Sequence, residues 1–206
     1  MYIELHSHSA FSFLEGASLP ENLIAACANL KMSAMALLDR DGFYGSPRFH
    51  MAAKKAGIKA HLGAEVTCER FSPQRHRDIE QNATGHRLTT AKHQIDHQQS
   101  KTKDPSVSLC LYGAFRLPLL VSSRLGYQNL CRLITKMKLR SAKGEGAVRE
   151  EELQDHAAGL ICLTGDDDGP LAFALAHGGR EEARGCVERL LHIAGRRPRE
   201  VRAGES

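Results

Sequence analysis

The first 69 residues contain apolar positions whose spacing alternates between strand-like and helix-like periods. Short continuous apolar runs are typical of buried strands, whereas apolar residues three or four positions apart predict one face of a helix. Ser18 followed by Glu21 fits a capping box, and Gly57 fits a helix end. The elements expected here are a short strand that carries 2–8, a helix over 19–30, a strand over 34–38, a helix over 46–55 and a strand over 58–62.

Two successive strand–helix units, with acidic residues placed after the strands, predict an α/β protein. They indicate a parallel sheet or barrel whose site lies at the carboxyl ends of the strands. Regular spacing resumes in the second half of the chain. The elements expected there are a strand over 115–122, a helix over 127–138, a short acidic helix after 146, a strand over 160–163 and helices up to about 176 and over 181–194.

The segment 70–105 interrupts this pattern, because it is rich in polar and basic residues and has no periodic apolar face. Such a composition cannot offset the entropy of ordering, so we expect an inserted, mostly disordered loop. The domain is then expected in two parts, 1–69 and 106–195. The last residues, 196–206, are expected to be a disordered or out-of-frame tail of a truncated product, and a natural basic terminus is the alternative.

Composition predicts a cytoplasmic globular protein. An apolar share of 42% in 206 residues is enough for a sizeable core, and neither a long apolar run nor a signal-like leader is visible, so no membrane association is expected. Six cysteines occur singly and are interpreted as reduced core thiols. The net charge is +4, and basic residues gather in 132–149 and 180–202, which favours either a weak preference for polyanions or solvated helix faces.

Histidine and carboxylate side chains near the predicted strand ends form a candidate metal site. His6 and His8 are two positions apart, so in a strand both imidazoles project on the same side. Glu15, Asp39 and Glu65 follow predicted strands or lie in nearby loops. Imidazoles combined with carboxylates suit zinc or manganese. The alternative is that a His-x-His pair occurs by chance, as short motifs do.

Three basic residues end the predicted helix over 127–138 or follow it directly. Lys136, Lys138 and Arg140 are candidates for a contact with DNA or phosphate. Cations also stabilise the carboxyl end of any helix through its dipole, so a purely structural role competes with this interpretation.

Four motifs stand in a fixed order along the chain, at 4–18, 38–42, 63–65 and 126–134, and the segments 136–140 and 143–146 continue the series. The series resembles the N-terminal PHP (polymerase and histidinol phosphatase) domain of bacterial C-family DNA polymerases, of the error-prone alpha-subunit type. The likeness covers about 1–69 and 115–195. It implies a distorted seven-stranded β/α barrel of the TIM-like kind, incomplete here, with two or three metal ions at the strand ends.

The resemblance also assigns roles to single residues. His6 and His8 match the first ligand pair, Glu15 stands where the family usually has Asp, Asp39 matches the Asp of an Asp-His pair, and Glu65 matches a bridging Glu.

This chain departs from the family pattern in three respects. Arg40 and Arg116 stand where the family has ligand histidines, and a guanidinium cannot coordinate a metal because it has no free lone pair. The last family ligands are expected beyond residue 206. Phosphoester hydrolysis is therefore expected to be weak or absent.

Three functions remain open at this point. The first is a PHP module of an error-prone polymerase alpha subunit, with DNA and the remainder of that subunit as partners, which has no polymerase activity alone but acts in replication or lesion bypass. The second is a stand-alone metal-dependent phosphoesterase or 3′–5′ exonuclease, in which bound metals would activate water. The third is a non-catalytic module that stabilises a polymerase or binds DNA.

Overall fold

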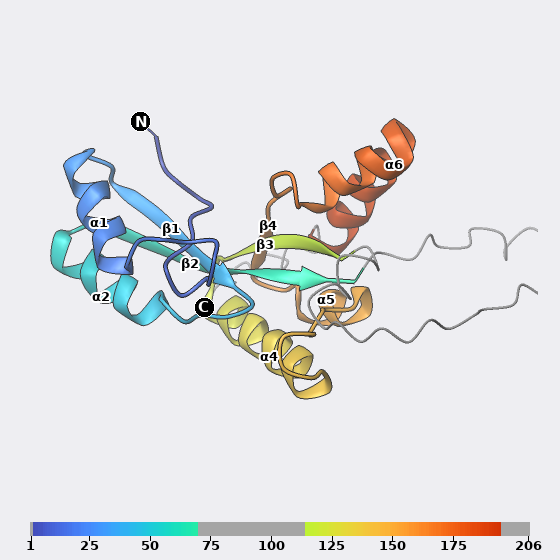
Figure 1. Cartoon of the computed structure of the whole chain (residues 1–206), viewed down its shortest axis with the longest axis horizontal. Helices are drawn as coiled ribbons and strands as arrows, with labels where there is room; N and C mark the ends of the chain where they lie inside the picture. The colour runs from blue at the N-terminus through green and yellow to red at the C-terminus, as the bar shows by residue number, and fades with distance from the viewer. Residues whose placement is uncertain (1, 70–113, 195–206) are drawn as a thin grey trace, which may run out of the picture.

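The computed structural model describes residues 2–69 and 114–194, which form a mixed α/β fold (Figure 1). The predicted fold class is thereby confirmed. The helices and strands, in chain order, are α1 (Pro20–Asn29), β1 (Ala34–Arg40), α2 (Ser46–Ala56), β2 (Lys59–Cys68), β3 (Phe115–Val121), α4 (Arg124–Arg140), α5 (Glu150–His156), β4 (Leu160–Cys162) and α6 (Pro170–Ala194).

Four strands form one open sheet in the order β1-β2-β3-β4. β1 runs parallel to β2, whereas β3 runs antiparallel to both β2 and β4. Among the strands of the described residues, the parallel arrangement expected from the strand–helix units is found between β1 and β2, and isolated parallel bridges join Glu4 to Met35 and Cys68 to Val148. The antiparallel direction of β3 departs from this expectation, because a strand buried on both faces has the same apolar run in either direction, so its sequence does not specify its direction.

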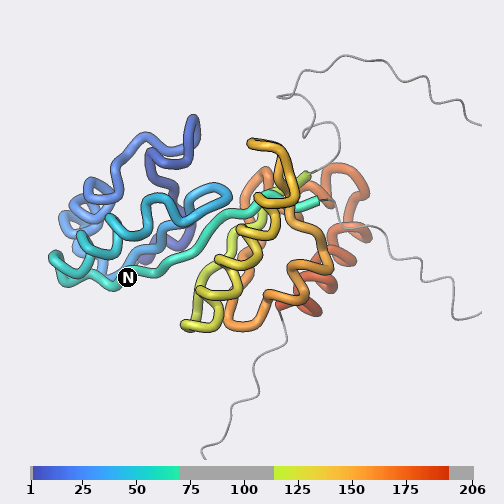
Figure 2. Tube along the Cα trace, turned by 90° about the horizontal axis from the view of Figure 1, so that it is seen from below, coloured from blue at the N-terminus to red at the C-terminus, as the bar shows by residue number. Residues whose placement is uncertain are grey.

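The helices pack around the sheet in two groups. α1 and α2 cover β1 and the first half of β2, where Ile24, Leu37 and Phe49 belong to one apolar cluster. α4, α5 and α6 surround β3, β4 and the second half of β2, where Leu117 and Leu133 belong to a larger cluster. Figure 2 shows the two groups side by side, with β2 running from one into the other. The long strand β2 therefore joins both parts of the core.

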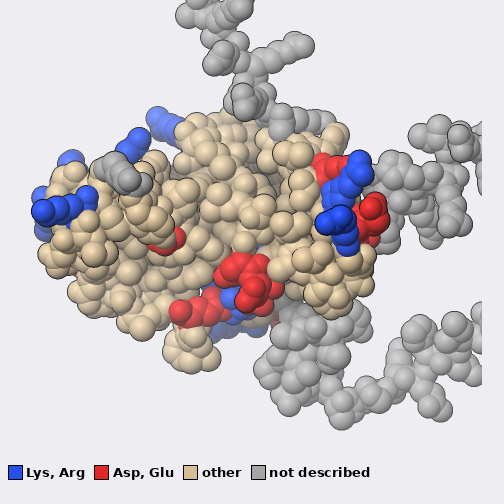
Figure 3. Space-filling view, turned by 90° about the horizontal axis from the view of Figure 1, so that it is seen from above, with Lys and Arg blue, Asp and Glu red and all other residues tan. Residues whose placement is uncertain are grey.

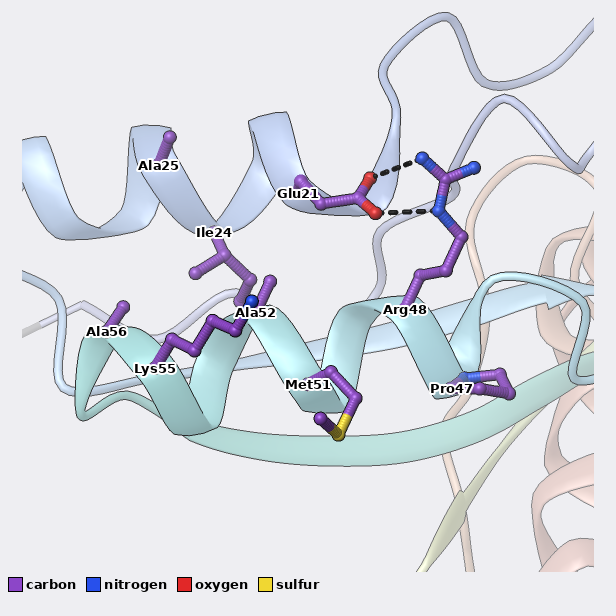
Figure 4. A pocket seen from close by; sticks show the side chains of 9 residues that line it. All are labelled: Glu21, Ile24, Ala25, Pro47, Arg48, Met51, Ala52, Lys55 and Ala56. Atoms are coloured by element: carbon purple, nitrogen blue, oxygen red, sulfur yellow. Dashed lines mark hydrogen bonds and ion pairs between the residues drawn. The ribbon is translucent and has the colours of Figure 1, made fainter.

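A surface hollow of about 670 Å³ is lined by α1 and α2 (Figure 4). At one end Arg48 binds Glu21 in a bidentate ion pair, with Nε at 2.6 Å from Oε1 and Nη2 at 3.0 Å from Oε2. The remaining lining is mostly alkyl and comes from both helices: Ile24, Ala25, Pro47, Met51, Ala52, Lys55 and Ala56. The ion pair fastens the two helices to each other across the hollow.

The helix ends test the predicted start and stop signals. α1 begins at Pro20, and its N-cap is Leu19 without a side-chain cap, so the predicted capping box at Ser18 is wrong. Proline is favoured at the first helical position, because the backbone N–H that it lacks would have no partner within the helix there. The helix therefore begins at Pro20, one residue later than the predicted start. Gly57 ends α2 in the left-handed conformation, as predicted. α6 consists of two helical stretches that meet at a kink at Gly179 (φ 69°, ψ −159°), in agreement with the two helices expected there.

The cysteines of the described part are free thiols, as predicted. Burial, with a smaller effect of Cys186, raises the pKa of Cys162 to about 12, so this thiol stays protonated at neutral pH. Cys110, the predicted insert at 70–105 and the predicted tail at 196–206 lie outside the described residues. Among the helices of 2–69 and 114–194, none is both long and apolar enough to cross a membrane.

Candidate metal centre

His6 and His8 lie on an N-terminal segment that runs along the outer edge of β1. The predicted strand is reduced to one parallel bridge between Glu4 and Met35, supported by further backbone hydrogen bonds to β1. These bonds hold the segment extended, so residues two apart still face the same side. The two imidazole rings meet edge to face, with their centroids 5.1 Å apart.

Glu65 faces the two histidines from the neighbouring strand β2. Its side chain is only 2% exposed, and its Oε1 lies 2.9 Å from Nε2 of His6. Its Oε2 lies 3.2 Å from Nε2 of His8. The three residues each offer a ligand atom within 4.8 Å of the others. The structure thus brings together three of the five predicted metal ligands.

The donor set of His6, His8 and Glu65 fits a divalent metal ion. Nε2 of His8 and Oε2 of Glu65 are buried, and their mutual 3.2 Å contact lacks hydrogen-bond geometry, so neither atom has a hydrogen-bond partner. A buried polar atom without a partner costs about 1–3 kcal/mol, and coordination would satisfy both atoms at once. Two imidazoles and a carboxylate are ligands that zinc accepts, and they also occur together in manganese sites.

The three side chains also shift each other's protonation. Burial alone would raise the pKa of Glu65, but the hydrogen bond with His6 and the contacts with His8 outweigh it and lower the pKa to about 2. The hydrogen bond to Glu65 raises the pKa of His6 above its ordinary value of 6.5, against the opposing effect of burial. Without a metal, the site therefore favours an ion pair between a protonated His6 and an ionised Glu65.

This ion pair predicts a defined pH dependence for the metal-free chain. Because the pKa of His6 is raised in the folded chain, its interaction with Glu65 stabilises the fold fully below pH 6.5. This stabilisation is lost as the pH rises through the pKa of His6 in the folded state. Because the pKa of Glu65 is lowered, its ionised carboxylate stabilises the fold fully above pH 4.5. This stabilisation is lost as the pH falls toward about 2. In EDTA, the difference in unfolding free energy between wild type and Glu65→Gln should therefore be largest between pH 4.5 and 6.5.

Glu21→Gln provides the control for this measurement. Glu21 pairs with Arg48, whose guanidinium does not titrate, so the effect of this substitution should not decline between pH 6.5 and 8. A Glu65→Gln effect that stays constant over that interval would contradict the pairing with His6.

Asp39 lies near the candidate metal centre, but hydrogen bonds from other protein groups already occupy its carboxylate. Its carboxylate is completely buried and accepts hydrogen bonds from the backbone N–H and the hydroxyl of Ser9, at 2.9 and 2.8 Å. The hydroxyl of Ser12 and the backbone N–H of Gly45 also donate to it, at 2.9 and 2.8 Å. A Cβ at residue 45 would lie 2.6 Å from Oδ2, so glycine allows this close approach. Asp39 organises the loops beside the site.

Glu15 is held by two guanidinium groups. Its Oε1 lies 2.7 Å from Nη1 of Arg40 and 2.8 Å from Nη2 of Arg116. Its Oε2 is buried without a hydrogen-bond partner. Arg40 and Arg116 are the two arginines that depart from the family pattern. Both form ion pairs with Glu15, which the sequence predicts to be a metal ligand.

Ser9 and Ser12 are site residues that the sequence reading did not identify. They fix Asp39, and Ser12 additionally accepts a hydrogen bond from the backbone N–H of Arg40 at 3.0 Å. The one available signal was the Ser-x-x-Ser spacing directly after His8. Serine is common in loops, so this spacing alone does not indicate a role.

The predicted DNA or phosphate contacts lie at the end of α4, away from the metal ligands in sequence. Arg140 and Lys136 are paired with Glu152 of α5, and Lys138 binds the hydroxyl of Tyr44. On the face drawn in Figure 3, basic and acidic side chains occur in small groups without a broad field of one sign. The observed pairs give these residues a structural role, and a contact with DNA stays a prediction.

Comparison with known proteins identifies the family of this chain. The family model described as the PHP domain matches residues 4–198. The chain therefore belongs to the PHP domain family, as its motifs predicted.

Its relatives include an error-prone DNA polymerase and a DNA polymerase III subunit alpha. An error-prone DNA polymerase of Nocardia farcinica is 35% identical over 182 residues, which is 85% of this chain and 16% of the relative. The DNA polymerase III subunit alpha of Treponema pallidum is 28% identical over 182 residues, which is 88% of this chain and 13% of the relative. The chain thus spans only a small part of the length of these relatives.

Among solved structures, an amidohydrolase from Chromobacterium violaceum aligns with 90% of this chain and 54% of its own, with a TM-score of 0.39 and 18% identity. This structural likeness is weak, and the family assignment rests on the sequence match.

Proposed function

We propose that this chain is the PHP module of an error-prone DNA polymerase alpha subunit and acts in DNA replication or lesion bypass through the remainder of that subunit. Its relatives are much longer polymerase subunits, which supports this context. The palm-domain carboxylates of a polymerase do not belong to the PHP part, so the chain alone is proposed to lack polymerase activity. Its own contribution is a single metal site of low hydrolytic activity.

One observation carries the second half of this proposal. The ligand atoms of His6, His8 and Glu65 converge, and two of them, Nε2 of His8 and Oε2 of Glu65, are buried without a hydrogen bond. Asp39 and Glu15, in contrast, are occupied by hydrogen bonds and by arginines. We propose that His6, His8 and Glu65 hold one zinc or manganese ion. A bound ion of this kind can polarise a phosphoester or lower the pKa of a coordinated water.

The residues around the ligands explain why hydrolysis should be poor. A general base must lie within hydrogen-bond reach of the water that it activates. Glu15 is another carboxylate close to the ligands, but it is paired with the guanidinium groups of Arg40 and Arg116. Asp39 is buried and already accepts from four donors. Neither carboxylate is free to take a proton from a water molecule or to hold another metal ion.

The test is the release of phosphate from a simple phosphomonoester, or of nucleotides from a DNA 3′ end, with added Mn²⁺ or Zn²⁺. We expect no turnover above that of the His6→Ala variant. Turnover in the wild type that disappears in both His6→Ala and Glu65→Ala would contradict the proposal and establish a metal-dependent phosphoesterase or exonuclease instead.

A further inference from the structure

Arg116 occupies a position between carboxylates at the edge of the metal site. It lies on β3 directly opposite Thr67 of β2, so it is a diagonal neighbour of Glu65 on the sheet. Its Nη2 is 2.8 Å from Oε1 of Glu15, and its Nη1 is 3.8 Å from Oε2 of Glu65. The guanidinium thus contacts one metal ligand and one carboxylate that was predicted to be a ligand.

Three carboxylates lie within ion-pair distance of Arg116: Glu15, Glu65 and the exposed Asp168, whose Oδ2 is 3.9 Å from Nη1. The two that line the metal site, Glu15 and Glu65, retain acceptor capacity. Oε2 of Glu15 and Oε2 of Glu65 are buried, and neither accepts a hydrogen bond. Two ionised carboxylates that share a poorly solvated space repel each other unless a cation lies between them. In this chain that cation is the guanidinium of Arg116, which is itself only 25% exposed.

We propose that Arg116 is the resident cation of a second cation position between Glu15 and Glu65, and that it limits the centre to one divalent ion. This rests on the proposed function, since it assumes that His6, His8 and Glu65 hold the first ion. A guanidinium supplies one positive charge and no lone pair, so it balances the carboxylates without coordinating them. Removing it should open the position to a second metal ion.

Arg40 provides a matched control within the same cluster. Its Nη1 lies 2.7 Å from Oε1 of Glu15, and its Nε lies 3.8 Å from Oδ2 of Asp41. Among the ion pairs of the described residues, Arg40 shares Glu15 with Arg116 but has none with Glu65. Its removal deletes an equal charge and leaves Arg116 between the two carboxylates.

The experiment measures the number of Mn²⁺ ions bound per chain by equilibrium dialysis, and their magnetic coupling by electron paramagnetic resonance. We expect Arg116→Met and Arg116→Gln to bind one ion more than the wild type, with the spectrum of a coupled pair. Arg40→Met and Arg116→Lys should bind the same number as the wild type. Combining Arg116→Met with Glu15→Gln should remove the additional ion.

Circular dichroism of each variant in EDTA identifies those that fold, and two neutral replacements are included so that one folded variant suffices. A folded Arg116→Met or Arg116→Gln variant without an additional ion overturns the proposal, and so does an additional ion in Arg40→Met. A wild type that binds no ion contradicts the proposed metal site instead. The gain relative to the wild type still decides the role of Arg116.

Discussion

Replacing Glu65 with glutamine is expected to weaken divalent-metal binding by roughly 100-fold or more. Glu65 provides the only carboxylate of the cluster formed by His6, His8 and Glu65 in the described residues. Changes to groups that merely orient metal ligands already cost about 10–100-fold in affinity, so the loss of a charged ligand should reach or exceed that range. The measurement is the dissociation constant for Zn²⁺, obtained by competition with a chelating dye at neutral pH.

Glu21→Gln is the matched control for this measurement. It removes an equal charge from an exposed ion pair with Arg48 on the helical layer, where no ligand of the cluster lies. Its affinity for Zn²⁺ should equal that of the wild type. An equal affinity in Glu65→Gln would show that the ion binds elsewhere.

Replacing Asp39 with alanine is expected to lower the free energy of unfolding by about 3–5 kcal/mol, because several hydrogen bonds to one buried carboxylate, each contributing about 1.5–3 kcal/mol, are lost together. The carboxylate is fully buried and accepts hydrogen bonds from Ser9, Ser12 and the backbone N–H of Gly45. Its removal leaves these donors unsatisfied in a space that water cannot easily enter. Urea denaturation in EDTA measures the change without a contribution from bound metal.

Ser12→Ala is the comparison variant, because it removes only part of the hydrogen-bond network around Asp39. It removes one donor to Asp39 and the acceptor of the backbone N–H of Arg40, so it should cost less than Asp39→Ala, about 1–3 kcal/mol. If Asp39→Ala loses no more than Ser12→Ala, the carboxylate has no special structural role. A metal affinity that falls with Asp39→Ala while stability does not would return Asp39 to the list of ligands.

The sequence predicted the convergence of His6, His8 and Glu65 better than it predicted the local structure around them. His6 and His8 face one side although the expected strand is only a bridge, because an extended segment alone produces that alternation. Glu65 was expected just beyond the strand over 58–62, yet β2 continues to Cys68. The spacing of the apolar residues predicted where these side chains lie along the chain and to which side they point. The extent of the strands around them depended on packing and was not predicted.

The roles of Glu15 and Asp39 could not be read from the sequence. A carboxylate at a strand end is equally suited to a metal, an arginine or a set of backbone N–H groups, and only the fold decides which of these lies nearby. Arg116 comes from a strand about 100 positions after Glu15 in the chain, so no local pattern reveals their contact. The same holds for the pair of Arg140 with Glu152, which the basic helix end alone does not predict.

The most direct test of the proposed single-ion centre is the X-ray absorption spectrum of the chain loaded with Zn²⁺. We expect imidazole scattering from two histidines at about 2.0–2.1 Å together with carboxylate or water oxygens. The imidazole signal should fall in His6→Ala and His8→Ala, and no neighbouring metal should be visible. A sulfur ligand, a shell without imidazole, or a second metal ion close to the first in the wild type would contradict the account.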